Sequence, residues 1–347
     1  MRIGLLAPPS LPVPPPAYGG IESVLDALAT GLEAAGHEVL LWATGDSTSA
    51  VATGWTYPEA VGTSAGDPAF ELRHVIDGYD ALRAWGADVV HDHTVTGPIY
   101  ARRFPDLPVV TTNHGPFDEE RTAVLRAVHT PVIAISHAQA ASHGEVPIVA
   151  VIHHGLDVAD YPPGAGEAGY VACLARMSPT KGVHTAARVA RTAGVPLRIA
   201  AKMRESAERE YYERRVAPLL GGEVDYVGEL NGKDKLELLA GASCLLNPIA
   251  WPEPFGMVMI EALACGSPVV TTPCGAAPEI VEDGCIGFLR RTAKGLVNAV
   301  GRVPELDRGA CRRAVKERFS TARMVADHVA VYAAVIERTG RSCAARR

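Results

Sequence analysis

The chain has 347 residues, of which 48% are apolar and 21% are charged. Because one domain usually comprises about 100–200 residues, this length predicts two domains, each with its own core. The composition is that of a globular protein and excludes a disordered or coiled-coil chain. The formal net charge of −6 excludes an overall positive field that would attract nucleic acid or anionic lipid, so any anion site must be local.

The chain carries no sign of export or membrane insertion. The start, MRIGLLAPPS, is typical of a first core strand and not of a secretory signal. No segment approaches the roughly 20 apolar residues of a membrane span. We therefore expect a soluble, cytoplasmic protein. Its scattered cysteines form no CxxC pair and are expected to be reduced, buried thiols. They are Cys173, Cys244, Cys265, Cys274, Cys285, Cys311 and Cys343.

Short β-branched, apolar runs in the first half of the chain indicate buried parallel strands. They cover residues 2–7, 38–43, 88–93, 108–114, 131–137 and 149–154. Helix-like segments lie between them, such as 21–34, where apolar residues recur at helical spacing. This βαβ alternation predicts a doubly wound sheet that binds ligands at the carboxyl ends of its strands.

A second α/β domain follows a linker. The run DYPPGAGEAG at 160–169 combines proline, glycine and charge, so we place the boundary there, with domains at 1–163 and 164–320. The segment 321–338 is a long amphipathic helix that must pack on structure already built. Two Rossmann-like domains facing a central cleft would suit a large, bipartite ligand. The strand pattern of the second domain covers 170–175, 197–202, 224–229, 244–249, 268–274 and 286–290.

The segment WPEPFGMVMIE at 251–261 is the first candidate site. Its prolines and Gly256 predict a turn that leaves backbone N–H groups free at a helix N-terminus, where phosphate binds. Glu253 precedes this helix and Glu261 lies within it, so the two carboxylates can reach different parts of one extended ligand. Carboxylates also suit vicinal sugar hydroxyls. The alternative is a capped helix in which Glu253 stabilises the N-terminus and Glu261 is solvated.

The second candidate site is RMSPTKG at 176–182, directly after the first strand of the second domain. Its serine–proline pair predicts a helix start near 179–182. Arg176 can bind two phosphate oxygens, and Lys181 supplies a point charge. Two surface cations on a loop are the alternative.

The third candidate site is the first βα turn, where a proline-rich stretch at 8–16 leads to Gly19 and Gly20. These glycines allow the backbone to approach a ligand closely before the helix begins. The spacing differs from the GxGxxG fingerprint, which disfavours a dehydrogenase. A glycine turn without a ligand is the alternative.

Histidines end several strands of the first domain. His114 can hydrogen-bond a sugar or its phosphate, or transfer a proton; a structural histidine is the alternative. The HDH triplet at 91–93 suggests metal binding, but alternating residues of a strand face one side and the carboxylate between them faces the other, so we predict no metal site there. His153 and His154 are expected to be structural or to line the cleft.

Taken in this order, the motifs resemble retaining glycosyltransferase family 4, of GT-B fold, over nearly the whole chain. The composition and length also resemble family 4 enzymes of antibiotic biosynthesis, such as that of avilamycin assembly. The motifs are Gly19-Gly20-Ile21-Glu22, Asn113-His114-Gly115, the stretch Arg176 to Gly182, Val227-Gly228, and Glu253 with Glu261 after seven intervening residues.

The resemblance implies roles for these residues. Gly19 and Gly20 would approach the donor's diphosphate or sugar, and His114 would contact the sugar. Arg176 and Lys181 would neutralise the diphosphate. Glu253 would bind sugar hydroxyls and phosphate, and Glu261 would bind both ribose hydroxyls. The base would contact the turn at Val227, Gly228 and Leu230. Phosphate and sugar would also contact the backbone of Phe255, Gly256, Met257 and Val258. The helix 321–338 would cross back to the first domain.

The implied reaction moves a sugar from a nucleoside-diphosphate sugar, with UDP as the expected nucleotide, to a small-molecule or oligosaccharide acceptor. Cations and helix ends would stabilise the leaving phosphate, so no metal ion or other cofactor is expected. Same-face attack would give retention without the two carboxylates of a glycosidase. A sugar-nucleotide epimerase or phosphorylase on the same fold, or a non-catalytic sugar-nucleotide-binding protein, remains an alternative. No nucleic-acid partner is expected.

Overall fold

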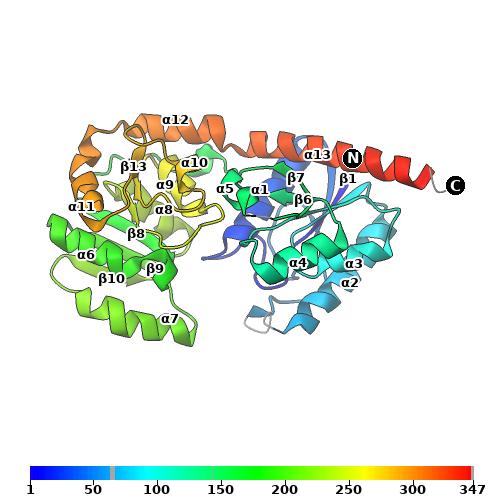
Figure 1. The fold of residues 1–347 in the computed structure, drawn as a ribbon, viewed down its shortest axis with the longest axis horizontal. Helices are drawn as coiled ribbons and strands as arrows, with labels where there is room; N and C mark the ends of the chain where they lie inside the picture. Colours follow the sequence, from blue (N-terminus) through cyan, green and yellow to red (C-terminus); the bar gives the residue numbers. More distant parts are fainter. Residues whose placement is uncertain (63–66, 143, 345–347) are drawn as a thin grey trace. The chain divides into compact units, whose positions relative to one another are not determined.

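The computed structural model describes residues 1–62, 67–142 and 144–344. It divides into two compact units: unit 1, Met1–Gly155 with Thr321–Arg347, and unit 2, Leu156–Ser320. Each unit contains one parallel sheet with helices packed on it (Figure 1). The predicted class, two doubly wound α/β domains, is confirmed.

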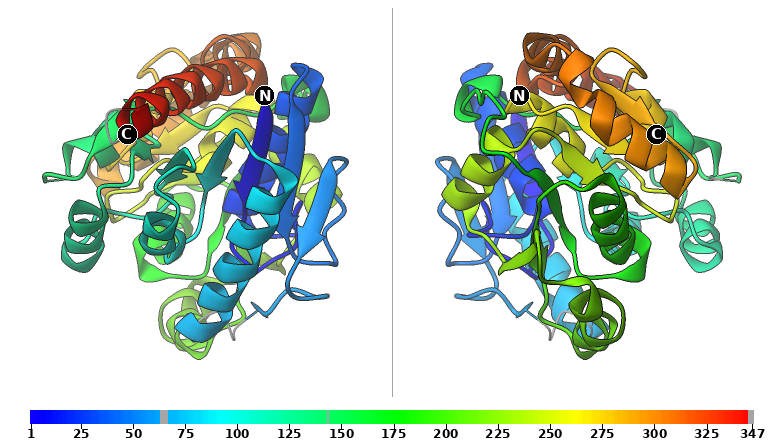
Figure 2. Two further views of the ribbon diagram at one scale, coloured as in Figure 1. Left: turned by 90° about the vertical axis from the view of Figure 1, so that its right-hand side faces the viewer. Right: turned by 90° about the vertical axis from the view of Figure 1, so that its left-hand side faces the viewer.

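Unit 1 is built on a seven-stranded sheet of order β3-β2-β1-β4-β5-β6-β7. All neighbouring strands are parallel, and helices cover both faces of the sheet (Figure 2). The strands are β1 Arg2–Leu6, β2 Glu38–Ala43, β3 Ala52–Trp55, β4 Val89–Asp92, β5 Val109–Thr112, β6 Val132–Ala134 and β7 Ile148–Val151. The helices are α1 Gly20–Ala34, α2 Pro68–Trp85, α3 Gly97–Tyr100, α4 Glu119–Val128, α5 His137–Ala141 and α13 Thr321–Ala344.

Sequence periodicity missed strand β3. Its four residues, ATGW, have a glycine in the middle, and none of them is buried. An edge strand of this kind gives no apolar run, so its pairing with β2 supplies the only indication of it. Trp55 at its end is 53% exposed.

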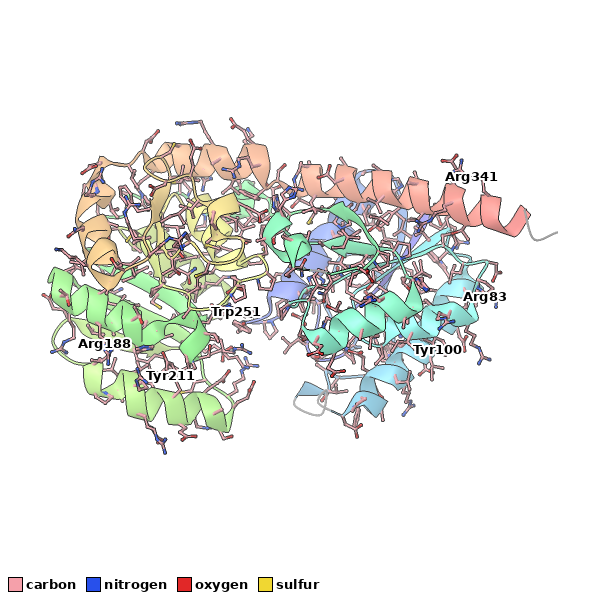
Figure 3. The ribbon with its side chains drawn as sticks, in the orientation of Figure 1. Arg83, Tyr100, Arg188, Tyr211, Trp251 and Arg341 are labelled. Carbon is pink, nitrogen blue, oxygen red and sulfur yellow. The ribbon has the colours of Figure 1, made fainter. Side chains whose placement is uncertain are left out.

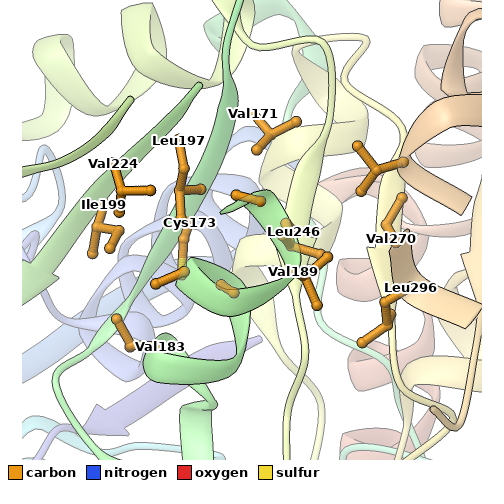
Figure 4. Packing of buried hydrophobic residues seen from close by; sticks show 14 of the residues in the cluster. Val171, Cys173, Val183, Val189, Leu197, Ile199, Val224, Leu246, Val270 and Leu296 are labelled. Atoms are coloured by element: carbon orange, nitrogen blue, oxygen red, sulfur yellow. The ribbon is translucent and has the colours of Figure 1, made fainter. Parts of the chain in front are cut away.

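Unit 2 is built on a six-stranded parallel sheet of order β10-β9-β8-β11-β12-β13. The core lies between this sheet and helices α6 and α11, and consists mainly of aliphatic side chains (Figure 4). The strands are β8 Val171–Arg176, β9 Leu197–Lys202, β10 Val224–Gly228, β11 Leu245–Asn247, β12 Val269–Thr271 and β13 Gly287–Leu289. The helices are α6 Val183–Ala193, α7 Ser206–Tyr211, α8 Gly232–Gly241, α9 Met257–Ala264, α10 Ala277–Ile280, α11 Ala293–Arg302 and α12 Arg308–Arg318.

The strand orders fix where each unit can bind a ligand. In unit 1 the chain changes direction across the sheet between β1 and β4, and in unit 2 between β8 and β11. In open α/β sheets, ligands bind at such switch points, outside the carboxyl ends of the strands. The loops there are those that follow β1 and β4 in unit 1, and β8 and β11 in unit 2.

The division between the units lies between Gly155 and Leu156, ahead of the boundary predicted at 163–164. The proline- and glycine-rich run is not a free linker, because unit 2 already holds it. The backbone N–H of Leu156 donates to the Phe319 carbonyl at 2.9 Å. Arg308 Nε donates to the Gly164 carbonyl at 2.8 Å. A turn-like composition marked the region correctly but could not show these long-range contacts.

The long C-terminal helix α13 belongs to unit 1, where it packs on α1, β4 and β5. It runs to Ala344, beyond the predicted end at 338. No helix among the described residues combines the length and apolarity needed to cross a bilayer. The expectation of buried cysteines is wrong at two positions, because Cys274 is half-buried and Cys285 is exposed. The side chain of Cys343 lies outside the described residues.

Candidate functional site

The loop after β8 carries the predicted phosphate-binding cations. Arg176 ends the strand, and residues Pro179–Lys181 form a single 3₁₀ turn. The α-helix α6 begins at Val183, after the predicted start, because Gly182 interrupts the turn with a φ of +69°. A Cβ at Gly182 would lie 2.0 Å from the Pro248 carbonyl oxygen, so glycine alone allows this loop to pack against the chain after β11.

Lys181, Glu253 and Trp251 form one hydrogen-bonded cluster, of which Figure 3 labels Trp251. Lys181 Nζ lies 2.5 Å from Glu253 Oε2, and Trp251 Nε1 donates to the same oxygen at 2.7 Å. The Lys181 and Glu253 side chains are only 17% and 10% exposed. Among the described residues, no side chain or backbone group donates to Glu253 Oε1. This carboxylate therefore has one oxygen fixed by the protein and one left to accept from a ligand.

Two glycines hold Glu253 in this position. Gly256, three residues after the glutamate, has a φ of +98° and caps the N-terminus of α9. Gly275, with a φ of +55°, brings the loop after β12 so close that a Cβ would lie 2.2 Å from the Glu253 carbonyl oxygen. That carbonyl accepts from Ala276 N at 2.9 Å. The loop before α9 is consequently braced from both sides.

The second predicted glutamate, Glu261, is paired in the same manner. It lies on α9, is 7% exposed, and its Oε1 is 2.7 Å from Nζ of Lys235 on α8. The alternative of a solvated Glu261 is therefore wrong, because the helix that carries it is buried along most of its length. No described group donates to its Oε2. The negative charge of Glu261 also contributes to raising the pKa of the Tyr161 hydroxyl, after burial of that hydroxyl itself.

Arg176 contributes a donor that has no partner. Its Nε is buried and makes no hydrogen bond within the described part of the chain. A buried donor without an acceptor costs about 1–3 kcal/mol, so it marks a position where a bound acceptor would be stabilised. This guanidinium differs from Lys181, which already has a carboxylate beside it.

The predicted base-contacting turn ends β10. Val227 is 41% exposed, and Gly228 has a φ of +86° with open space where a Cβ would be. The pairing of β10 with β9 shifts register here. Arg204 donates to Glu229 from Nη2 and Nε, at 2.6 and 3.0 Å, while Leu230 packs on the core beside α8. The turn therefore offers open backbone next to a fixed charged pair.

In unit 1 the glycine turn is closely packed. Gly19 caps α1 with an extended φ of 166°, so its backbone does not demand glycine. Space does, because a Cβ would lie 2.6 Å from Pro15 and 2.9 Å from Glu22 Oε2. Gly20 begins the helix. Glu22 is 5% exposed, and burial raises its pKa to about 7.

The histidines of unit 1 form a stacked cluster. His114, after β5, has its Nε2 2.8 Å from Nδ1 of His93, which follows β4. The His91 and His93 ring centroids are 3.9 Å apart, and His154 stacks on His114 at 5.3 Å. Burial lowers the pKa of His114 to about 3, with a smaller effect of His328, so its imidazole is neutral at physiological pH.

The HDH triplet follows the predicted alternation. His91 and His93 face the cluster, whereas Asp92 bonds Tyr79 on the other side at 2.7 Å. Both His91 nitrogens are engaged, at 2.7 Å from Thr112 Oγ1 and 2.7 Å from Tyr332 OH. They are therefore not available to a metal ion without breaking these bonds.

An apolar groove lies beside the chain that follows β4. It has a volume of about 420 Å³ and is shallow. Its lining comes from the first turns of α2 and from α3, both on the side of the sheet's carboxyl edge. Figure 3 labels Tyr100 in this region. The lining residues are Leu72, Thr96, Ile99, Tyr100 and Arg103.

Several site residues were missed by sequence reasoning. Trp251 stands two positions before Glu253, so its place in a tryptophan- and proline-rich turn was an available signal. No sequence signal marked Lys235, because it resembles any lysine of an amphipathic helix. Gly275 could be recognised only from its contact with Glu253. The structure brings Lys181 together with Glu253, and His114 together with His93.

Comparisons with known proteins agree with this architecture. Residues 18–160 match the family described as Glycosyltransferase Family 4, and residues 163–313 match Glycosyl transferases group 1. The glycogen synthase of Mycobacterium tuberculosis (strain H37Rv) is 29% identical, over 90% of this chain and 88% of its own. AviGT4, a glycosyltransferase involved in avilamycin A biosynthesis, has a TM-score of 0.72 and 26% identity, over 97% of this chain and 98% of its own.

A third protein shares the fold alone. Anabaena HepE, solved in complex with UDP and glucose, has a TM-score of 0.76 at 20% identity, over 96% of this chain and 99% of its own. The two family matches together span most of the chain and correspond to its two α/β units. The chain belongs to the family 4 glycosyltransferases of GT-B fold and is an enzyme of the glycosyltransferase class, EC 2.4.

Proposed function

We propose that this enzyme transfers a sugar from a nucleoside-diphosphate sugar to an acceptor hydroxyl, with retention of anomeric configuration and without a metal ion. The observation that carries the proposal is the pair of part-buried Lys–Glu contacts on and before α9. In each, one carboxylate oxygen is held by lysine and the other has no donor among the described residues. Glu253 would accept from sugar hydroxyls and Glu261 from the ribose.

The burial of these ion pairs favours a ligand-binding role over a stabilising one. A buried ion pair contributes little net stability, because desolvation of both charges offsets their attraction. Both pairs nevertheless place their glutamates on one helix or the loop before it, next to the switch point of the sheet. They hold ionised acceptors rigidly where vicinal hydroxyls would bind, which reduces the entropy lost on binding.

Three groups support a diphosphate beside them. The buried Nε of Arg176 has no acceptor in the described part of the chain, and a phosphate oxygen would supply one. Lys181 adds a cation on the same loop, and the N-terminus of α9 adds the positive end of a helix dipole. Together they would stabilise negative charge on the leaving phosphate as the glycosidic bond breaks, which removes the need for a bound cation.

The bonding of Glu253 supports same-face attack over a covalent glycosyl intermediate on this carboxylate. Its Oε2 accepts from both Lys181 and Trp251, and such a doubly bonded carboxylate is a weak nucleophile. We therefore favour attack by the acceptor on the same face that the diphosphate leaves. The C1–O bond breaks with its electron pair going to the diphosphate, the acceptor oxygen bonds C1, and its proton passes to a β-phosphate oxygen.

UDP is the nucleotide we propose first, since a protein of the same fold was solved with it; this rests on fold-level analogy. The likeness to AviGT4 supports a setting in antibiotic or oligosaccharide biosynthesis. For the acceptor we propose a small molecule or oligosaccharide with one apolar face, which the groove beside α3 would bind.

Nucleotide binding without metal is tested by a thermal-shift screen of UDP, GDP, dTDP and ADP in EDTA. A nucleotide present at 100 times its Kd stabilises the fold by about 2.7 kcal/mol, which raises Tm by about 5 °C. We expect one nucleotide to do so. The absence of a shift with all four, or a shift that requires Mg²⁺, would contradict the proposal.

Retention is then tested with the matching sugar donor and water as acceptor, by NMR of the anomeric proton before mutarotation. An α-linked donor should release the α anomer first. Early release of the β anomer would show inversion.

A further inference from the structure

We propose that His93 is a positioning residue for His114, fixing the tautomer in which His114 offers an N–H at Nδ1 to the bound donor. Nothing in the sequence pattern assigns a role to His93 beyond its place in the HDH triplet. The assignment rests on the proposed function for the identity of the ligand. The coupling of the two rings rests only on their geometry.

The contact joins one nitrogen of each ring and leaves the other, outer nitrogen of each ring outside it. His93 Nδ1 and His114 Nε2 lie 2.8 Å apart, so one of them carries the proton of this hydrogen bond. The two remaining nitrogens, His93 Nε2 and His114 Nδ1, are buried and have no partner among the described residues. A neutral imidazole has one N–H and one lone pair. Two neutral rings joined in this way therefore have only two arrangements.

In the first arrangement, His93 Nδ1–H donates to His114 Nε2. His114 then carries its proton on Nδ1 and is a donor there, while His93 Nε2 is an acceptor. In the second, His114 Nε2–H donates to His93 Nδ1, and the two outer atoms exchange character. The outer atom of His114 is thus a donor only while His93 supplies the proton between the rings.

The rings are held so that neither can rotate out of this contact. The His93 backbone N–H donates to the Leu6 carbonyl at 2.9 Å, which ties it to β1. His91 lies against it and is itself fixed by Thr112 and Tyr332. His154 stacks on the His114 ring, with an angle of 26° between the planes. Both rings consequently keep one orientation when the ligand is absent.

The first arrangement suits the proposed donor. Phosphate oxygens only accept, and a sugar hydroxyl can accept, so an N–H at His114 Nδ1 would bind either. A bare nitrogen there would repel a phosphate oxygen. Burial also keeps both rings neutral, since it lowers the pKa of each histidine. The positioning effect is therefore one of tautomer and not of charge.

The test combines ¹⁵N NMR of histidine-labelled enzyme with two His93 variants. His93→Asn keeps a hydrogen-bonding atom near the position of Nδ1, whereas His93→Phe keeps a ring without one. In ligand-free wild type and in His93→Asn, we expect His114 to show a protonated Nδ1. In His93→Phe, His114 should shift to the Nε2–H tautomer that free histidine prefers. His37→Phe, a half-buried histidine near the N-terminus, is the matched control and should leave the His114 signals unchanged.

Kinetics with the sugar donor provide the second readout. Loss of one hydrogen bond of about 1.4 kcal/mol lowers kcat/KM about 10-fold in His93→Phe, with recovery in His93→Asn. A bare Nδ1 on His114 in the wild type would overturn the proposal, as would unchanged His114 signals in His93→Phe. Because the NMR experiment uses ligand-free enzyme, it tests the coupling of the two rings even if no nucleotide binds. If His93→Phe fails to fold, the His114 signals of the wild type and of His93→Asn still show whether Nδ1 is protonated, which decides the proposal.

Discussion

Replacing Lys181 with alanine is expected to lower kcat about 10²–10³-fold, the range seen when one preorganised electrostatic stabiliser of a transition state is removed. Lys181 is the cation that the structure fixes against Glu253, at 2.5 Å from Oε2 and 5.2 Å from the Trp251 ring. Its loss removes positive charge beside the leaving phosphate. It also frees Glu253 to move. Steady-state kinetics with the sugar donor, in EDTA, measure the effect.

A loss of stability must be separated from this loss of catalysis. In Lys181→Ala, Glu253 stays buried with Trp251 as its remaining donor, which costs about 3 kcal/mol of folding free energy. The double variant Lys181→Ala with Glu253→Gln removes the unpaired charge and should recover Tm without recovering activity. Lys233→Ala, at an 84% exposed lysine on α8, is the control and should behave as wild type. Full activity in Lys181→Ala, or activity restored by the double variant, would contradict the phosphate-binding role.

Acidification from pH 7 to pH 5 is expected to unfold unit 1 before unit 2. Burial strongly lowers the pKa of six histidines in unit 1, to about 4 for His74 and His328 and to about 3 for His114. Below pH 6.5 these histidines bind protons in the unfolded chain but stay neutral in the folded protein. Stability is therefore lost as pH falls from 6.5 towards 4, by about 2 kcal/mol per histidine at pH 5. The others are His91, His93 and His154.

Two carboxyls oppose this trend without cancelling it. Burial raises the pKa of Glu22 to about 7 and that of Asp92 to about 6, so their folded forms take up protons first. The stability they contribute grows as pH falls through those values and is lost as pH rises. At pH 5 the stability lost through the six histidines exceeds the stability gained through the two carboxyls. Unit 2 contains one histidine, His184, which makes it the less acid-sensitive unit.

Tryptophan fluorescence can report the two units separately. Trp42, Trp55 and Trp85 lie in unit 1, and Trp251 lies in unit 2. In Trp251→Phe, the emission should change with a midpoint between pH 6 and 4, while circular dichroism still shows the helices of unit 2. His74→Gln, which preserves a donor for the Ala7 carbonyl, should shift the midpoint to lower pH. Unfolding of both units in a single transition, or of unit 2 first, would contradict the histidine account.

Much of this architecture could be predicted because α/β sequences show it locally. Apolar runs marked the buried strands, and motifs at strand ends marked the loops of both switch points. Arg176, Lys181 and Glu253 were predicted as site residues in this way, since charged side chains stand there next to turn-forming glycine and proline. The edge strand β3 escaped because it is short and unburied.

The remaining features depend on contacts between distant residues. Lys235 and Glu261 are 26 residues apart, and His91 and Tyr332 are 241 apart. No local pattern distinguishes such a lysine or tyrosine from its neighbours on an amphipathic helix. The same holds for the unit boundary, where backbone pairing of Leu156 with Phe319 decides the division. Periodicity predicts which face of a helix is buried, but only the folded chain shows which residues that face contacts.

Calorimetric titration of UDP into the wild-type enzyme in EDTA tests metal-free donor binding most directly. We expect one site per chain, an affinity that added Mg²⁺ leaves unchanged, and binding about 10-fold weaker in Glu261→Gln, the loss of one charge-assisted hydrogen bond to the ribose. Absence of binding, a requirement for Mg²⁺, or wild-type affinity in Glu261→Gln would contradict the proposed donor site.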